Sequence, residues 1–391
     1  MKFRGLSRGK VIPKSFFGVH LVSLTGWLGY TTQFPSDLGA GSVRMWDTGT
    51  TWRRMETSKG VWDYSRADAV LAVLAANGVT NITFTLGQPP LWATGGIGPA
   101  TGSFNPNPPT NIQDWRDYVT AMVVRYGSIV TEWEIWNEID LAQFWAGSNS
   151  QMVQLTQEAA TIIKSLSPAA KVIGANTSTF SPQISLPYME ASYAYTDIDA
   201  THLYGTGSQP EFKGPLFNLI KAGQRSNGIS RPIWNTEYTY DNYYLNGVLQ
   251  TGDNNPMPPD MAASYVARLL MMNWLFGFER CYFYVYDNFG FNNIRLMNDA
   301  MTAPSKAGRA FSYISSLLSG GTLSSFKQID SHFEAAFTTS SGRFGRAFWC
   351  ADDASATVDL SGYSYGADVE GTPIMISASY LLDMSPVFTF N

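Results

Sequence analysis

Eight short runs rich in β-branched and aromatic residues alternate with longer helix-patterned runs over most of this chain. Buried parallel strands prefer such residues, and a parallel return requires a crossover that is usually a helix. The pattern therefore predicts an α/β fold with a parallel sheet and helices outside it. The eight predicted strands are 16–20, 42–46, 82–86, 131–136, 171–175, 199–204, 232–236 and 280–286.

Segments with apolar residues at helical spacing lie between these strands. The predicted helices are 65–77, 114–126, 151–166, 262–276 and 305–318, with Gly78 as a C-cap of the first and Pro304 before the last. A closed (β/α)₈ TIM barrel accommodates all eight strands. An open doubly wound sheet is the alternative, but such sheets usually carry a glycine fingerprint after the first strand, and none follows residue 20.

The character of the sequence changes after Leu318, where Gly320 and Gly321 interrupt it. Short β-patterned pieces separated by Gly and Ser turns follow, at 325–329, 333–338, 346–350, 357–360 and 377–381. We therefore predict two domains. A catalytic barrel spans 1–318 and a small accessory β-sandwich-like domain spans 319–391, with residues 1–15 as candidates to pair with the second.

Charge and hydropathy restrict the class of partner. The 391 residues carry a formal net charge of −5, which disfavours a nucleic-acid partner bound through its phosphates. No apolar run reaches the ~18–20 residues that span a membrane. No apolar core of a signal peptide follows the basic N-terminal residues, so a secreted or periplasmic location would require a leader that has been removed. Location is otherwise open, as is the oligomeric state.

Cysteine and histidine, the residue types that commonly bind transition metals, are few and scattered in this sequence. Cys281 lies in an apolar run, which indicates a buried thiol, although a disulfide with Cys350 remains compatible with the sequence. The three histidines, His20, His202 and His332, are distant in sequence, and no metal-binding spacing or phosphate-binding loop appears. We expect neither a metal nor an organic cofactor.

Two of the predicted strands end in a glutamate. Asn137-Glu138 closes the fourth, and Glu237 follows the seventh. In barrel enzymes this end of the strands carries the chemistry, and a carboxyl desolvated there has a raised pKa and can donate a proton. The alternative is that Glu138 only begins an exposed loop. Glu132 and Glu134 alternate with apolar residues before the strand ends, and we expect them to be structural.

Paired carboxyl groups are the catalytic equipment of glycoside hydrolysis. One protonates the leaving oxygen, and the other attacks the anomeric carbon or activates water. Strands four and seven face each other across a barrel, so Glu138 and Glu237 could approach to the ~5–5.5 Å of retaining enzymes. Aromatic residues make up 14% of the chain, which suits a sugar-binding cleft as well as an ordinary core.

These motifs resemble glycoside hydrolase clan A. The clan places an Asn-Glu acid/base after strand four and a Glu nucleophile at the end of strand seven, and Asn137-Glu138 and Thr236-Glu237 match them. Segments 42–46, 60–65 and 199–204 are similar to the clan's second strand, the approach to its second helix and its sixth strand. Within the clan, Gln-Pro-Pro-Leu-Trp at 88–92 resembles family 39 and the related bacterial exopolysaccharide hydrolases. The resemblance covers 16–318.

The resemblance implies roles for individual residues. Glu138 would be the general acid/base and Glu237 the nucleophile. Asn137 would hydrogen-bond the sugar 2-hydroxyl, and Arg44 would keep Glu237 ionised. Either His202 or Tyr204 would hydrogen-bond Glu237; for Arg44, His202 and Tyr204 the alternative is an ordinary core position. Further candidates for sugar contact are His20, Asp47, Trp46, Trp92, Tyr238, Tyr240, Tyr284 and Tyr286.

The implied function is a retaining O-glycosidase that cleaves a polysaccharide or oligosaccharide by double displacement, endo-acting on an exopolysaccharide. An exo-acting β-xylosidase-like enzyme is the first alternative. The second is a non-catalytic polysaccharide-binding protein, which would normally have lost one of the two carboxylates. The chain departs from the clan at strand eight, where many members place a tryptophan under the sugar and this sequence has Tyr284 and Tyr286.

Overall fold

The computed structural model describes residues 9–24, 34, 38–99, 104–178, 181–206, 209–245, 248–251, 255–287, 293–352 and 354–391. Eight parallel strands form its central sheet: β1 (Phe17–Leu21), β2 (Ser42–Met45), β5 (Ile82–Leu86), β6 (Glu132–Ile135), β7 (Lys171–Ile173), β8 (Asp199–His202), β10 (Ile233–Tyr238) and β13 (Arg280–Phe283). Their order is β7-β6-β5-β2-β1-β13-β10-β8. Every predicted strand is present.

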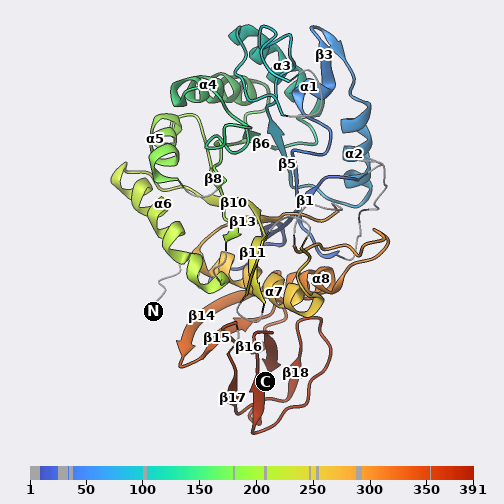
Figure 1. The fold of residues 1–391 in the computed structure, drawn as a ribbon, viewed down its shortest axis with the longest axis vertical. Coiled ribbons are helices and arrows are strands. Elements are labelled where there is room, and N and C mark those ends of the chain that lie inside the picture. The colour runs from blue at the N-terminus through green and yellow to red at the C-terminus, as the bar shows by residue number, and fades with distance from the viewer. Residues whose placement is uncertain are drawn as a thin grey trace.

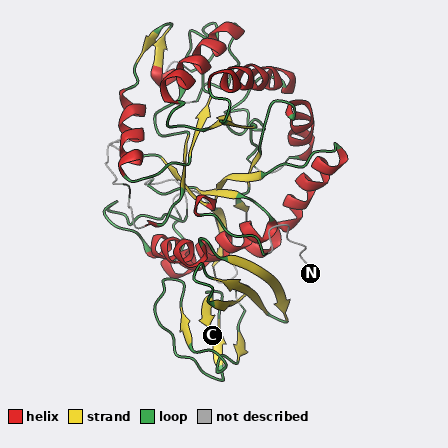
Figure 2. Ribbon diagram, turned by 180° about the vertical axis from the view of Figure 1, so that it is seen from behind, coloured by secondary structure: helices red, strands yellow, loops and turns green. Residues whose placement is uncertain are grey.

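The two outer strands of this order, β7 and β8, also meet. Gly174 donates its backbone N–H to Ile198 over 3.0 Å, and Asp197 donates to Val172 over 2.8 Å. These bonds close the sheet on itself, and the ring of strands is visible in Figure 2. The predicted (β/α)₈ barrel is confirmed, and the open doubly wound sheet is excluded.

Helices surround the barrel (Figures 1 and 2). They are α2 (Ser65–Ala76), α3 (Ile112–Tyr126), α4 (Asn149–Leu166), α5 (Pro182–Ser192), α6 (Gly214–Ser226), α7 (Pro259–Phe276) and α8 (Lys306–Leu318). The sequence pattern did not reveal α5 and α6. Pro187 lies inside α5 and Gly223 lies inside α6, and both residue types ordinarily argue against a helix interior.

Local signals fix the ends of several helices. Ser148 and Gln151 form a capping box before α4, in which the serine side chain accepts from the Gln151 backbone and the glutamine side chain accepts in return from the Ser148 backbone. The side chain of Asn111 accepts from the backbone of Gln113 at the start of α3. Gly277 ends α7 in the left-handed region, at φ 115°.

A small sheet stands beside the carboxyl ends of two barrel strands. It has the order β12-β11-β9, in which β9 (Gly205–Thr206) comes shortly after β8 and β11 (Tyr240–Leu245) shortly after β10. The third strand, β12 (Val248–Gln250), pairs antiparallel with β11. The same end of the barrel carries α1 (Trp52–Met55) and a hairpin of β3 (Glu56–Ser58) and β4 (Val61–Trp62). We call this three-stranded sheet, β12-β11-β9, the side wall of the barrel mouth.

The C-terminal part forms an antiparallel sheet that packs under α7 and α8 (Figure 1). Its strands, in spatial order, are β14 (Thr322–Ile329), β15 (His332–Thr338), β16 (Phe344–Cys350), β20 (Val387–Phe390) and β18 (Tyr365–Ala367), with a separate pair β17 (Ala356–Val358) and β19 (Tyr380–Leu382). Val11 bridges to Thr322 of β14, whereas residues 1–8 lie outside the described residues.

Two further observations concern questions that the sequence left open. Cys281 and Cys350 are both buried free thiols, so they do not form a disulfide with each other. Among the described residues, no helix combines the length and the hydropathy needed to cross a bilayer.

Candidate active site

The loop that carries Glu138 begins with an unusual backbone. Trp136 and Glu138 both adopt left-handed conformations, with φ 64° and 44°. Such positions cost on the order of 1–3 kcal/mol each in a non-glycine residue, so the surroundings must hold them. The indole N–H of Trp136 donates to the backbone oxygen of Phe144 over 2.7 Å. The backbone N–H of Glu138 donates to Oδ1 of Asn176 over 2.8 Å. This local geometry turns Asn137 and Glu138 toward the barrel mouth.

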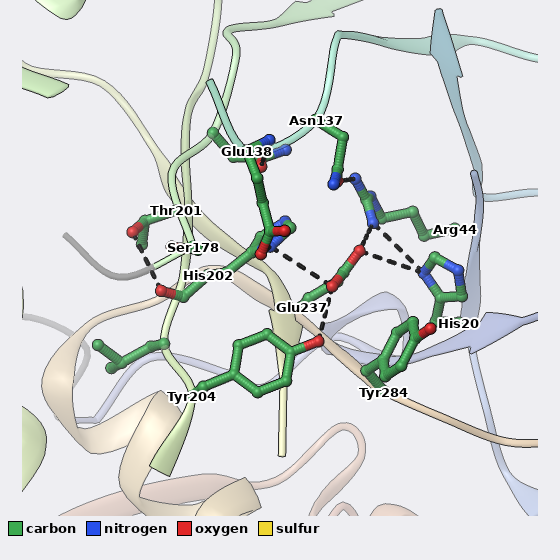
Figure 3. A network of polar contacts seen from close by, with 12 residues as sticks. His20, Arg44, Asn137, Glu138, Ser178, Thr201, His202, Tyr204, Glu237 and Tyr284 are labelled. Atoms are coloured by element: carbon green, nitrogen blue, oxygen red, sulfur yellow. Dashed lines mark hydrogen bonds and ion pairs between the residues drawn. The ribbon is translucent and has the colours of Figure 1, made fainter. Parts of the chain in front are cut away.

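Glu138 and Glu237 face each other at the carboxyl ends of β6 and β10 (Figure 3). One carboxylate oxygen of each lies within 4.8 Å of the other. Nδ1 of His202 stands between them, 2.9 Å from Oε1 of Glu138 and 3.4 Å from Oε2 of Glu237. Retaining glycosidases hold their two carboxyl groups at ~5–5.5 Å, and inverting enzymes need ~6.5–9.5 Å for an intervening water. The observed separation is of the retaining kind.

Both oxygens of Glu237 accept hydrogen bonds. Oε1 accepts from Nη1 of Arg44, and Oε2 accepts from the hydroxyl of Tyr204 over 2.7 Å. Nδ1 of His20 lies 3.9 Å from Oε1. The carboxylate is thus fixed in orientation and faces a permanent cation, which stabilises its negative charge.

Arg44 is completely buried and serves several partners at once. Its Nε donates to Glu134 over 2.6 Å, its Nη2 donates to Oδ1 of Asn137 over 2.7 Å, and its Nη1 lies 3.3 Å from Nδ1 of His20. Burial alone would lower the pKa of Arg44, but the carboxylates of Glu134 and Glu237 raise it above its usual range. The guanidinium therefore stays charged and orients the nucleophile candidate and Asn137 together.

Glu138 differs from Glu237 in its electrostatic environment. Burial, together with the smaller effect of the negative charge of Asp140, raises the pKa of Glu138 to about 8. A carboxyl group with this pKa is protonated at neutral pH and can donate a proton to a leaving oxygen. Burial also lowers the pKa of His202 to about 4, so the imidazole between the two carboxyl groups is neutral.

A second polar group adjoins Glu237 on the side of β1 and β2. Nε2 of His20 lies 2.8 Å from Oδ1 of Asp47, and the hydroxyl of Tyr284 donates to Oδ2 of Asp47 over 2.9 Å. The side chain of Asp47 keeps 24% of its surface exposed, while the ring of Tyr284 is almost completely buried. Figure 3 shows His20 and Tyr284 on the Arg44 side of Glu237.

Several aromatic candidates lie outside this group. Tyr238 and Tyr286 are fully buried in the main core, Tyr238 against Phe283 and Tyr286 against Phe34. Successive side chains of a strand point to opposite faces, so the inward Glu237 sends Tyr238 outward. Tyr240 is also fully buried, with its ring 4.6 Å from that of Tyr265.

The two candidate tryptophans have different positions. The indole N–H of Trp92 donates to the backbone oxygen of Glu56, and its ring packs edge-on against Trp52 at 6.0 Å. This places the partly buried Trp92 in the packing around the hairpin of β3 and β4, and its contact with sugar stays a prediction. Trp46 is 2% exposed and its ring lies 6.4 Å from that of Phe144, so it packs behind the loop after β6.

Sequence reasoning missed residues that support the catalytic side chains through hydrogen bonds. Asn176 accepts from the Glu138 backbone and donates to Glu134 over 2.9 Å, so it ties both ends of the β6 motif together. It follows the end of β7, and a polar residue at that end of a barrel strand was the available signal. Asp140 accepts from the backbone and the hydroxyl of Ser178. Glu134, which we expected to be structural, is fully buried and accepts from Arg44 and Asn176.

Glu138, His202 and Glu237 each offer a metal-ligating atom, all within 4.8 Å of one another. Both oxygens of Glu237 are already occupied by Arg44 and Tyr204, and the guanidinium would oppose a second cation at that point. The geometry therefore fits proton transfer and nucleophilic attack better than metal ligation.

Solved structures that are similar to this chain include several glycoside hydrolases. A family 39 glycoside hydrolase from Bacteroides cellulosilyticus WH2 matches with a TM-score of 0.75 at 16% identity, over 97% of this chain and 81% of that one. A GH39 β-xylosidase from Caulobacter crescentus matches with a TM-score of 0.65 at 15% identity, over 99% and 97%. A GH51 arabinofuranosidase from Xanthomonas axonopodis pv. citri matches with a TM-score of 0.64 at 12% identity, over 99% and 97%. At these identities the likeness establishes the fold.

The sequence model of the family described as glycosyl hydrolases family 39 matches residues 36–205 of this chain. This segment contains the Asn137-Glu138 motif as well as Arg44 and Tyr204. The chain is a glycosidase of the clan A type. A comparison with curated protein sequences gave no match. The second glutamate of the glycosidase, Glu237, lies outside the matched segment. The role that we give to Glu237 therefore depends on the geometry at the end of β10.

Proposed function

We propose that this glycosidase cleaves O-glycosidic bonds by double displacement, with Glu138 as acid/base and Glu237 as nucleophile. Glu237 attacks the anomeric carbon while Glu138 protonates the departing oxygen, which gives a glycosyl ester on Glu237. Glu138, now a carboxylate, then takes a proton from water as the water attacks the same carbon and frees Glu237. The observation that carries the proposal is the approach of the two carboxyl groups to within 4.8 Å.

The different environments of the two glutamates support this division of roles. Glu138 has the raised pKa of a proton donor, with burial as the main cause. Glu237 accepts from Arg44 and Tyr204, which stabilise the charge that a nucleophile needs. Asn137, held by Arg44 over 2.7 Å, is placed to bind the sugar hydroxyl beside the reacting carbon.

The substrate we propose is a polysaccharide, cut internally, of the exopolysaccharide kind. The side wall of the barrel mouth supports an extended substrate because it presents large apolar side chains to solvent. Tyr244 is 41% exposed and Leu249 44% exposed. Such side chains suit the apolar C–H faces of sugar units on either side of the cleaved bond. The alternative is exo action, in which one terminal sugar is removed at a time; one solved structure of the same fold is described as a β-xylosidase.

A hydrolysis screen over aryl glycosides and purified polysaccharides tests the proposal. The wild type is compared with Glu138→Gln and Glu237→Gln, which keep the shape of each side chain and remove its ability to ionise. We expect oligosaccharide products from the wild type and no turnover from Glu237→Gln. Unchanged turnover by Glu237→Gln would refute the nucleophile assignment. Monosaccharide as the first product would favour exo action over endo action, and binding without cleavage would favour the binding-protein alternative.

A further inference from the structure

Asp47 is an ionised carboxylate beside the reacting glutamates, and it can accept more hydrogen bonds than it forms in this structure. Burial opposes ionisation, but His20, Tyr284 and Arg44 together hold the pKa of Asp47 below its usual value. Its side chain is 24% exposed, whereas the side chains of His20 and Arg44 are 0% exposed. The exposed part of this network is therefore the side chain of Asp47.

The hydrogen bonds around His20 fix the direction of this network. Arginine has only donors, so Nη1 of Arg44 donates to Nδ1 of His20. The remaining ring proton then lies on Nε2 and is donated to Oδ1 of Asp47, while Tyr284 donates to Oδ2. Each oxygen of an ionised carboxylate can accept two hydrogen bonds, so each retains one free lone pair. A group that binds there must be a donor.

The charges that act most strongly on Glu138 have one dominant sign. Besides burial, the strongest electrostatic influences on Glu138 come from three carboxylates, those of Asp140, Asp47 and Glu134, and from one cation, Arg44. The hydrogen-bonding groups of that cation are engaged by Glu134, Glu237, Asn137 and His20. The stretches between 25 and 353 that lie outside the described residues contain no lysine, arginine or histidine. They supply no cationic side chain for an acidic substrate.

We propose that Asp47 is a specificity-determining residue that requires a hydroxyl or an ammonium group on the bound sugar and discriminates against sugars with a carboxylate. The inference rests on the proposed glycosidase function, because it assumes that a sugar occupies the space beside Glu237. It assigns the substrate class as polysaccharides of neutral or amino sugars. Uronic acid polymers are excluded, because a substrate carboxylate would meet an anion that cannot donate a hydrogen bond.

Ligand-detected NMR binding of monosaccharides tests this without any turnover. The probes are a hexose, its 2-amino sugar and its hexuronate at pH 7, each in the gluco, galacto and manno configurations. The proteins are the wild type, Asp47→Asn, and Asp63→Asn, which removes the same charge from an exposed turn. For the best configuration, we expect the wild type and Asp63→Asn to bind the hexuronate at least about 10-fold more weakly than the hexose.

In Asp47→Asn, the hexose should bind more weakly than it binds the wild type, whereas the hexuronate should bind at least as tightly as it binds the wild type. The ratio of the hexuronate Kd to the hexose Kd should therefore shrink by several-fold. Equal binding of hexose and hexuronate by the wild type would overturn the inference. So would an unchanged ratio in Asp47→Asn, or the absence of binding by every sugar. These outcomes are separate from failure of the proposed function, which the hydrolysis screen with Glu237→Gln detects independently.

Discussion

Nη1 of Arg44 donates a hydrogen bond to Oε1 of Glu237, and neither side chain has more than 6% of its surface exposed. The same guanidinium contacts the buried Glu134 over 2.6 Å. One cation from β2 therefore neutralises two carboxylates, one from the barrel interior and one at the reacting centre. Loss of one member of a buried ion pair leaves an uncompensated charge, so this contact links stability with activity.

Arg44→Met should lower the free energy of unfolding by about 3–5 kcal/mol and abolish hydrolysis, because Glu134 and Glu237 both lose their cation. Urea unfolding followed by circular dichroism measures the first effect. Arg44→Lys is the matched variant, since it keeps the charge but loses the fork of donors. It should recover part of the stability but little of the activity. Wild-type stability in Arg44→Met would contradict this view of the contact.

The rate should depend on pH through the proton on Glu138. Its folded-state pKa is raised to about 8, so the acid form predominates at neutral pH and is lost as pH rises through that value. The kcat/KM of the wild type should therefore fall above pH 8, give or take a unit. In Glu138→Gln, assayed with an activated aryl leaving group, this alkaline limb should disappear. If the alkaline limb of kcat/KM persists in Glu138→Gln, it reports the titration of another ionisable group, which would contradict the assignment.

Asp140 offers an independent test of the same assignment. Its negative charge raises the pKa of Glu138, so Asp140→Asn should lower that pKa. The alkaline limb of kcat/KM should then move to lower pH, by roughly half a unit to one unit. A pH profile of the variant on the same substrate measures the shift. Displacement to higher pH would show that Asp140 acts in some other way.

The hydroxyl of Tyr204 donates to Oε2 of Glu237 over 2.7 Å, so Tyr204→Phe removes one of the two donors on the nucleophile. We expect kcat to fall roughly 10²-fold, by analogy with the loss of a single preorganised donor to a reacting oxygen. Tyr193→Phe, at a ring that is 53% exposed, serves as the matched control and should leave kcat unchanged. Equal rates for the two variants would show that the Tyr204 hydroxyl plays no part.

A buried cluster joins the C-terminal sheet to the barrel. Arg268 of α7 forms ion pairs with Glu211 over 2.7 Å and with Asp352 over 2.6 Å, and the indole N–H of Trp349 donates to Glu211 over 2.8 Å. Glu211→Gln should lower the free energy of unfolding by about 3–5 kcal/mol. Glu334→Gln, in the more exposed pair with Arg346, should cost less than about 1 kcal/mol. Similar losses for both would argue against a buried connection.

The sequence predicted the barrel and the two central glutamates because both depend on local patterns. Apolar strands that end in Asn137-Glu138 and in Glu237 identify the carboxyl ends of β6 and β10, and barrel topology brings those ends together. The roles of Asn176 and Asp140 depend on contacts between different loops, which no local pattern encodes. Tyr238 was assigned to the site because it adjoins Glu237 in sequence, but alternation along β10 turns it into the core.

The central claim is a covalent glycosyl ester on Glu237. Its most direct test uses a 2-deoxy-2-fluoro glycoside of the sugar found in the hydrolysis screen, with an activated leaving group that allows the first step while the fluorine slows the second. Mass spectrometry of the intact protein and of its peptides should show one fluorosugar per chain, attached to Glu237, and none in Glu237→Gln. A sugar attached to any other residue, or an inverted product configuration without attachment, would contradict the account.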